Sequence, residues 1–334
     1  MSNTEYQFIA IGDIVTDEFI ELDPHEAVVN DTLDNRKSLT MYFGEKLPFK
    51  GFVNVPAVGN APNAAVSAHR LGLKAALVTD IGNDEGGREI QDHLTNEGVD
   101  QTFVRVHEGK ETNHHYVLRY NAERTILIKH EAYPYTMPDI DSPKWIYFSS
   151  VGEDSLPYHH AIAEYVKSHP DTKLAFQPGS FQIKLGYETL KDLYEACELF
   201  FCNREEAMLI LGINDRDIKG LLSGLYDRGV SLPVVTDGPD GAYVRDADGN
   251  IWHMPMYPDP APPVDRTGAG DSFSSTFTAC MALGMSVPEA LARGPINSMN
   301  VVQYVGAQAG LLSMEQIEEY LAKAPEEYVA TQIT

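Results

Sequence analysis

The stretch of this chain most suited to chemistry is VDRTGAGDSF, residues 264–273. Its glycines are followed by DSFSSTFTACMALG, in which small and apolar residues recur at helical spacing. The pattern predicts a tight turn that leads into a helix N-terminus. The backbone N–H groups of Gly268, Ala269, Gly270 and Asp271 would then lack helical partners, with the positive end of the helix dipole behind them. We therefore expect an anion-binding site at this turn.

Two interpretations of Asp271 follow from the residues alone. It is either the capping residue of the helix, or a carboxylate that accepts a proton beside a bound anion. Phosphoryl transfer uses such a pairing, because backbone donors neutralise the transferred group while a carboxylate receives the proton of the attacking hydroxyl. The chain contains no GxxxxGK[ST] motif, so a phosphate site here would depend on backbone donors and Mg²⁺ rather than on a P-loop lysine.

Composition limits the class of protein. Of 334 residues, 43% are hydrophobic and 22% charged, which is typical of a folded globular protein. Acidic residues outnumber basic ones by 49 to 25, and the net charge of -24 argues against nucleic acid or an anionic membrane as a partner. The three cysteines, Cys197, Cys202 and Cys280, match no zinc spacing and predict reduced thiols. The N-terminus resembles neither a signal peptide nor a membrane span, so we expect a cytoplasmic protein.

Short β-rich runs alternate along the chain with segments of helical period. The expected strands are Gln7–Ile11, Ala75–Thr79, Trp145–Phe148, Lys173–Phe176, Leu199–Cys202 and Pro233–Thr236. The expected helices are Ala61–Leu71, Glu85–Asn96, Leu156–Lys167, Glu205–Leu211 and Ile218–Arg228. This alternation predicts an α/β fold, with a doubly wound, mostly parallel sheet between two layers of helices. No repeat or linker divides the chain, so a single domain over residues 1–334 is expected.

Four segments do not fit this alternation and predict a small antiparallel β-sheet. They are Ser38–Phe43, Thr102–Val106, Asn113–Arg119 and Arg124–Lys129, with NAER as a hairpin turn between the last two. We place these strands in insertions at about residues 14–55 and 102–130. The sheet is either a surface ribbon or a lid that excludes water from a site, and the residues alone do not decide between them.

VDRTGAGDSF resembles the C-terminal signature of the ribokinase-like (PfkB) family of carbohydrate and nucleoside kinases. Residues 57–87, AVGNAPNAAVSAHRLGLKAALVTDIGNDEGG, resemble the N-terminal signature of this family. GDIVTD (12–17), NREE (203–206) and TDGPDG (236–241) are similar to three further family motifs. The five motifs occur in the family's order and span about residues 7–312. The resemblance implies the family's fold and an ATP- and Mg²⁺-dependent phosphotransfer to a hydroxyl.

The resemblance also implies the roles of individual residues at the acceptor side. Asp271 would be the general base, and Gly268, Ala269 and Gly270 would form the anion hole for the transferred phosphoryl group. The acceptor would be held by three residues: Asp17, Gly59 and Asn63. Asp17 would lie at the C-terminal end of a strand, where open α/β sheets bind their ligands. From its own surroundings in the sequence, Asp17 equally fits an exposed turn.

Further residues would serve the metal and the nucleotide. Asn203 and Glu206 would act on Mg²⁺ through water, although their spacing also fits a capping box at a helix start. Thr236, Gly238 and Gly241 would line the phosphate side of ATP, although the glycines also fit a plain hairpin turn. Asn297 lies where the resemblance places the start of the helix at the adenine edge. Activation by a monovalent cation such as K⁺ is left open.

Two departures from the family pattern leave the acceptor unidentified. Val58 replaces the first of two adjacent glycines, and Gln177 stands where many members have an aspartate. Arg266 would contact either an acidic group of a substrate or a surface carboxylate. In the expected lid, the adjacent His114 and His115 would point to opposite faces of a strand, so at most one of them faces the pocket. An apolar lid face exposed in a monomer would favour a homodimer formed through the lid.

The sequence thus predicts a kinase that phosphorylates a small sugar, with a primary hydroxyl as the favoured acceptor. A nucleoside kinase of the same fold is the nearest alternative, because the variable lid would contain the residues that stack on a base. A non-catalytic sensor of sugars or nucleotides is the alternative from another class. A sensor needs a binding pocket but no general base. This chain has Asp271 and Glu206 as well as the residues of the expected anion hole, which favours catalysis.

Overall fold

A computed structural model describes residues 6–32, 37–121 and 123–333. Its central sheet has seven parallel strands: β1 (Phe8–Ile11), β6 (Ala75–Gly82), β7 (Val104–His107), β10 (Trp145–Phe148), β11 (Lys173–Phe176), β12 (Leu199–Asn203) and β13 (Leu232–Thr236). Three antiparallel strands extend one edge: β14 (Ala242–Arg245), β15 (Ile251–Met254) and β16 (Thr331–Ile333). The order is β16-β15-β14-β13-β12-β11-β10-β1-β6-β7. The expected mostly parallel α/β fold is confirmed.

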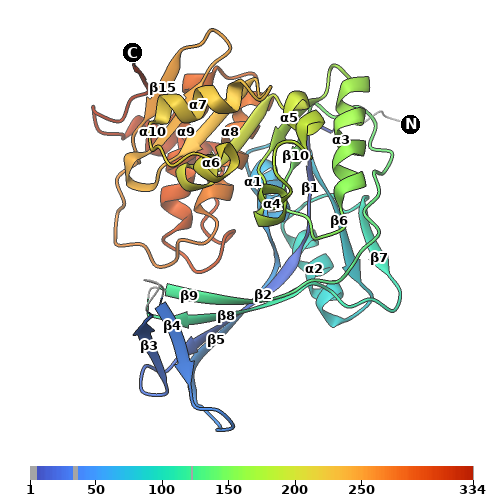
Figure 1. Ribbon diagram of the computed structural model, residues 1–334, viewed down its shortest axis with the longest axis vertical. Coiled ribbons are helices and arrows are strands. Elements are labelled where there is room, and N and C mark those ends of the chain that lie inside the picture. Colours follow the sequence, from blue (N-terminus) through green and yellow to red (C-terminus); the bar gives the residue numbers. More distant parts are fainter. Residues whose placement is uncertain (1–5, 33–36, 122, 334) are drawn as a thin grey trace.

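Helices cover both faces of this sheet (Figure 1). On one face lie α1 (Asn60–Arg70), α2 (Glu85–Asn96), α8 (Ala269–Ala282), α9 (Val287–Val301) and α10 (Met314–Ala322). On the other lie α3 (Leu156–Ser168), α5 (Lys191–Ala196), α6 (Arg204–Leu211) and α7 (Ile218–Tyr226), with α4 (Ser180–Leu185) in the loop before α5. Phe8 of β1 packs in the first core and Ile9 in the second, as the alternation of side chains along a strand requires. Both cores are therefore built on one buried sheet.

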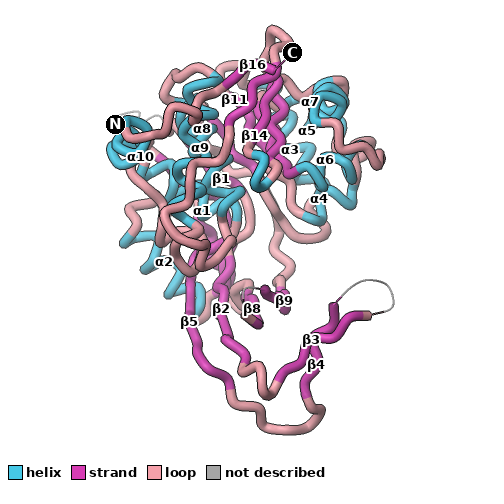
Figure 2. The backbone as a smooth tube through the Cα atoms, turned by 90° about the vertical axis from the view of Figure 1, so that its left-hand side faces the viewer, coloured by secondary structure: helices cyan, strands magenta, loops and turns pink. Residues whose placement is uncertain are grey.

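A second sheet extends from this body and forms the lid, at the bottom of Figure 1. It contains β2 (Val15–Leu22), β5 (Phe49–Val58), β8 (His114–Tyr120) and β9 (Glu123–Lys129), in the order β5-β2-β8-β9. The hairpin of β3 (Ala27–Asp31) and β4 (Lys37–Met41) projects from its far end (Figure 2). β8 and β9 form the expected hairpin. Its turn, NAER, includes Ala122, which lies outside the described residues.

One expected lid strand belongs to the central sheet. We expected Thr102–Val106 in the lid, whereas β7 pairs in parallel with β6 as the edge strand of the main sheet. The side chains of β7 are only partly buried, so the strand has the mixed polar and apolar sequence VRVH rather than an apolar run. Such a sequence does not distinguish the edge of a parallel sheet from a strand of a lid.

Within the described residues, no helix is both long and apolar enough to cross a membrane.

Candidate active site

The helix predicted after the TGAG turn is α8, which begins at Ala269 with Gly268 as its N-cap. Gly268 has a φ of 81°, a left-handed conformation that favours glycine. A Cβ atom at this position would lie 2.3 Å from the Cβ atom of Ala307, so the turn also packs closely on the segment after α9. The N–H groups of Ala269, Gly270 and Asp271 lie in the first turn, where a helix offers them no internal acceptor. The expected opening for an anion is therefore structurally available.

Asp271 is held by three side-chain amides. Asn60 Nδ2 donates to Asp271 Oδ1 over 2.8 Å, and Gln177 Nε2 donates to the same oxygen over 3.0 Å. Asn63 Nδ2 donates to Asp271 Oδ2 over 2.8 Å. Since Gly268 is the N-cap, the interpretation of Asp271 as the capping residue is wrong. The carboxylate is instead directed away from its own helix, toward α1 and the loop after β11.

Gln177 is fixed by a buried hydroxyl pair beneath it. Its Oε1 accepts a hydrogen bond from the hydroxyl of Tyr147, and the hydroxyl oxygen of Ser274 lies 2.7 Å from that of Tyr147. Burial raises the pKa of Tyr147 well above its usual value, so its hydroxyl keeps its proton and remains a donor. The Gln177 amide group is thereby turned to offer Nε2 to Asp271. A carboxylate in the place of Gln177 would instead repel Asp271.

The three expected acceptor-binding residues lie on β2 and at the start of α1. Gly59 is the N-cap of α1 with a φ of 126°, and a Cβ there would lie 2.7 Å from the carbonyl oxygen of Asp13. Asn63, in the first turn of the same helix, is the residue that the structure brings directly to Asp271. Asp17 lies near the start of β2, not at the C-terminal end of a strand or in an exposed turn as expected, and its Oδ1 contacts His115 Nδ1 of β8 at 3.1 Å. The lid therefore supplies Asp17, and the body supplies Asn63 and Gly59.

A chain of carboxylates and imidazoles continues from Asp17 into the body. His115 Nε2 bonds to His130 Nε2 over 3.0 Å, and His130 Nδ1 lies 3.4 Å from Asp13 Oδ2. Asp13 also accepts from the hydroxyl of Tyr135, whose pKa burial raises well above its usual value. The sequence predicted none of these partners of Asp17, because His130 and Tyr135 lie outside the strands and far along the chain. These contacts, from Asp17 through His115 and His130 to Asp13, join the lid to the loop that follows β1.

His114 lies on the opposite face of β8, as the strand period predicts. Its Nε2 lies 3.4 Å from Glu18 Oε1, and its ring packs against Tyr116. His114 and His115 therefore belong to different surroundings and do not share a site. Among the described residues, no group of three or more His, Cys, Asp or Glu side chains could hold a metal ion.

Two neighbouring cavities lie beside the start of α8. The larger has a volume of about 350 Å³ and is lined by Thr236, Gly238 and Gly241 together with Ala269 and Gly270. Most of the rest of its lining is apolar: Ala242, Met256, Pro239, Pro263, Phe273, Pro295, Met299 and Val302. The three residues expected on the phosphate side of the nucleotide thus share one cavity with the expected anion hole. A cavity of this composition suits a flat, largely apolar group held beside polar backbone donors.

The smaller cavity, of about 190 Å³, brings together the expected metal-side residues. Asn203 and Glu206 line it with Gln177, Thr236 and Gly270. Asn203 caps α6, and each of the pair accepts from the other's backbone N–H, so the capping box expected as an alternative is present. Burial, as the largest cause, raises the pKa of Glu206 above its ordinary value. The capping role and a place beside the cavity thus coexist in one pair.

The expectation for Asn297 requires a correction. No helix begins there, because Asn297 lies inside α9 and is fully buried. Its Nδ2 donates to Thr276 Oγ1 over 2.8 Å, and its Oδ1 accepts the N–H of Leu312 over 2.9 Å. It does not line the larger cavity, whereas its neighbours Pro295 and Ser298 do. The observed contacts of Asn297 are therefore structural ones that join α8, α9 and the segment before α10.

Arg266 lies at the rim of the same cavity. It lines the cavity together with Asp259, whose pKa is raised by burial and lowered in smaller part by the charge of Arg266. Of the two contacts expected for Arg266, the structure thus favours proximity to a carboxylate, and the residue also lines the larger cavity.

Comparison with solved structures identifies the fold. A structure of ribokinase from Arabidopsis thaliana complexed with ribose and ATP matches with a TM-score of 0.80 and 20% identity, covering 95% of this chain and 99% of that one. A nucleoside kinase from Methanocaldococcus jannaschii, described as an archaeal member of the ribokinase family, matches with a TM-score of 0.78 and 17% identity, covering 96% and 99%. The fold is that of ribokinase.

Sequence comparison identifies the family. Fructoselysine 6-kinase of Escherichia coli is 24% identical over 261 residues, which cover 75% of this chain and 90% of the relative. The 5-dehydro-2-deoxygluconokinase of Bacillus subtilis is 23% identical over 290 residues, which cover 79% and 86%. The model of the pfkB family carbohydrate kinases matches residues 28–314. The chain belongs to this family and is a phosphotransferase with an alcohol group as acceptor.

Proposed function

We propose that this protein transfers a phosphoryl group from ATP to a hydroxyl of a small sugar, with a primary hydroxyl favoured, and that Asp271 is the general base. The observation that carries the proposal is the position of Asp271. Asp271 lies in the first turn of a glycine-started helix, next to Gly270, which lines both cavities, and three amides orient its carboxylate. A carboxylate so placed can accept a hydroxyl proton while the helix N-terminus stabilises the negative charge of the phosphoryl group.

The residues around the two cavities fit ATP and Mg²⁺. Thr236, Gly238 and Gly241 would hold the nucleotide on the side of its phosphates, next to the N–H groups of Ala269 and Gly270. Asn203 and Glu206 would hold Mg²⁺ through its water shell, because this ion keeps several waters and needs few protein ligands. Bound Mg²⁺ would supply positive charge to the phosphate oxygens. Activation by K⁺ and a cytoplasmic location remain predictions.

A sugar acceptor agrees with the side chains that surround its expected position. Asp17 and Asn63 offer a carboxylate and an amide, which bind hydroxyl groups well. Two of the curated relatives carry the names of kinases for sugars or sugar derivatives. A nucleoside remains the alternative acceptor, since one solved structure of the same fold is a nucleoside kinase. For a base, His115 of the lid and His130 after β9 would offer imidazole rings, which lie face to face with centroids 5.2 Å apart.

The proposal is tested by measuring ADP release with ATP and Mg²⁺ over hexoses, pentoses, sugar acids, phosphosugars and nucleosides. We expect turnover with a neutral sugar, and a loss of kcat of about 10²- to 10⁴-fold in Asp271→Asn with little change in ATP affinity by calorimetry. Asp248→Asn is the matched control, because Asp248 is an exposed turn residue that lines neither cavity. Near-normal turnover in Asp271→Asn would refute the base role. Binding of ATP or sugar without turnover of any acceptor would support the sensor.

We also propose that the lid forms a homodimer. Pairing across the lid places Phe52, Tyr116 and Leu127 on the face opposite Asp17, and they are 50%, 44% and 52% exposed. A second copy of the same surface would cover these side chains, as a two-fold interface requires. Sedimentation equilibrium should show a dimer that Leu127→Glu converts to a monomer. The control Leu209→Glu changes a leucine that is 70% exposed on α6, outside the lid, and should remain dimeric. A monomeric wild-type protein would refute this proposal.

A further inference from the structure

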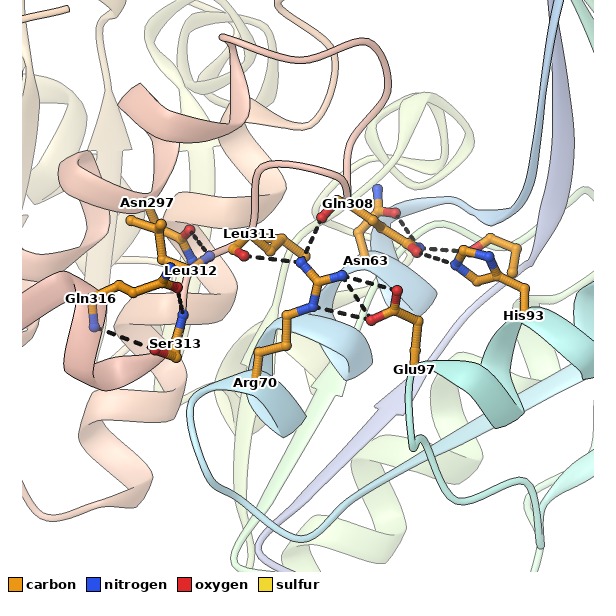
Figure 3. A network of polar contacts seen from close by, with 11 residues as sticks. Asn63, Arg70, His93, Glu97, Asn297, Gln308, Leu311, Leu312, Ser313 and Gln316 are labelled. Carbon is orange, nitrogen blue, oxygen red and sulfur yellow. Dashed lines mark hydrogen bonds and ion pairs between the residues drawn. The ribbon is translucent and has the colours of Figure 1, made fainter. Parts of the chain in front are cut away.

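A chain of side-chain contacts runs from His93 through Gln308 to Asn63 (Figure 3) and continues from Asn63 to Asp271. Gln308, in the segment between α9 and α10, is 4% exposed. Its Nε2 donates to the carbonyl oxygen of Ala57 over 2.7 Å and to Asn63 Oδ1 over 2.9 Å. Its Oε1 bonds to His93 Nε2 of α2 over 2.8 Å. Asn63 then donates to Asp271, so four side chains form one continuous line from α2 to the expected base.

Hydrogen-bonding chemistry determines the orientation of each amide in this line. The carbonyl oxygen of Ala57 can only accept, so the amide nitrogen of Gln308 must face it. The second hydrogen of that nitrogen is directed at Asn63, which must therefore present its oxygen to Gln308. Asn63 consequently presents its nitrogen to Asp271. His93 must carry its proton on Nε2, because the oxygen of Gln308 accepts from it. The carbonyl oxygen of Ala57 thus sets the direction of every amide as far as Asp271.

The number of hydrogen bonds that each oxygen accepts distinguishes the two carboxylate oxygens of Asp271. A carboxylate oxygen accepts about two hydrogen bonds. Among the described residues, Asn60 and Gln177 donate to Oδ1, whereas Asn63 alone donates to Oδ2. One acceptor position is therefore open, and it is on Oδ2. If the amide of Asn63 were reversed, its oxygen would face Oδ2 and repel it.

We propose that Gln308 is a positioning residue for the base, and that Asp271 Oδ2 is the atom that receives the proton. The proposal rests on the proposed function. In the step, the acceptor oxygen forms a bond to the phosphorus of the transferred group, and its O–H bond breaks. The proton passes to Oδ2, and the bond between the phosphorus and the leaving oxygen breaks to release ADP. Gln308 does not touch the reacting atoms, and it acts by holding Asn63 in the one orientation that supports Oδ2.

The backbone of Gln308 is held independently of its side chain. Arg70 Nη1 donates to the carbonyl oxygens of Gln308 and Leu311, each over 2.9 Å, and the guanidinium is itself held by Glu97 (Figure 3). A change confined to the side chain of Gln308 therefore leaves the course of this segment supported. This makes Gln308→Met a suitable probe, because methionine has a similar shape and forms no hydrogen bond with Asn63.

The test is a double-mutant cycle of Gln308→Met and Asp271→Asn, read as kcat for the best acceptor and as KM for ATP. We expect Gln308→Met to lower kcat about 10- to 100-fold, as a misplaced catalytic group does, with KM for ATP within about twofold of wild type. In the double variant, kcat should equal that of Asp271→Asn alone, because a group that acts only through the base has no effect once the base is gone. Gln316→Met, in the capping box of α10, is the matched control and should keep full kcat.

Two results would overturn the inference. One is a kcat of Gln308→Met within about twofold of wild type. The other is a double variant whose loss is the product of the two single losses, which would show that Gln308 acts apart from Asp271. If Gln308→Met does not fold, Gln308→Leu, which buries neither a charge nor a polar group, enters the same cycle. Failure of the proposed function is a distinct result, since Asp271→Asn itself would then keep its turnover.

Discussion

Replacing Gly268 by alanine should both destabilise the protein and impair catalysis. At a φ of 81°, a Cβ atom costs about 1–2 kcal/mol in backbone strain. It would also lie 2.3 Å from Ala307 Cβ and 2.6 Å from Ala307 Cα, an overlap that costs about a further 1–3 kcal/mol as neighbouring atoms shift. The free energy of unfolding should therefore fall by about 2–5 kcal/mol. The turn that presents the anion hole would move with it, so kcat should fall by about 10²-fold or more.

A second substitution, Gly284→Ala just after the C-terminal end of α8, separates the cost of backbone strain from the cost of steric overlap. The φ of Gly284 is 85°, and no atom lies within 4 Å of a Cβ built there, so Gly284→Ala should lose only the strain, about 1–2 kcal/mol. Urea denaturation followed by circular dichroism measures both variants, and ADP release measures their kcat. Gly284→Ala should retain wild-type kcat. Equal losses of stability in Gly268→Ala and Gly284→Ala would show that the segment at Ala307 does not pack on the turn, and would refute the reasoning.

Three further predictions concern separate parts of the molecule. Asp17→Ala should raise KM for the acceptor about 10- to 100-fold, because a charged hydrogen bond contributes about 1.5–3 kcal/mol, and an unchanged KM would remove Asp17 from the acceptor site. Glu206→Gln should raise the Mg²⁺ concentration for half-maximal rate. Because burial raises the pKa of Glu206, this carboxylate becomes protonated at a higher pH than an exposed glutamate does. As the pH falls, the wild-type protein should therefore need more Mg²⁺ for half-maximal rate. A Mg²⁺ requirement that does not change with pH would contradict the role of Glu206. Cys197, Cys202 and Cys280 are buried with raised pKa values, so a thiol reagent should modify them only after unfolding, and rapid labelling of the folded protein would contradict this.

Most of the fold could be predicted because the elements that build it are locally encoded. Buried parallel strands such as Trp145–Phe148 are short apolar runs, and helices such as Glu85–Asn96 have a clear amphipathic period, so the expected and observed bounds agree closely. The error at Val104–His107 has a physical cause, since an edge strand is half exposed and has no apolar run. The antiparallel edge, including Ile251–Met254, was not predicted, because its short strands follow turns and lack a crossover helix.

The geometry of the candidate site can be anticipated from the sequence where one contiguous motif contains the residues concerned. Asn203 and Glu206 are three residues apart, and helix geometry alone brings them together. The helix start expected at Asn297 was wrong, because α9 continues through Pro295, and a proline inside a helix is disfavoured and hides such continuity. Asn60 was within reach of sequence reasoning, since it is three residues before Asn63 and therefore on the same face of α1.

The surroundings of Asp271 show why the remainder could not be predicted. Its partners come from α1 and from the loop after β11, and the amide that orients Asn63 comes from the segment after α9, more than 200 residues along the chain from Asn63. An amide has no hydrophobic period and no fixed partner, so its role is decided only by the donor or acceptor that the fold places opposite it. All three donors to Asp271 are neutral, and they orient the carboxylate without placing a cation beside it. In a chain of net charge -24, the proposed function therefore requires that short-range donors at the start of α8, rather than the overall field, attract an anionic substrate.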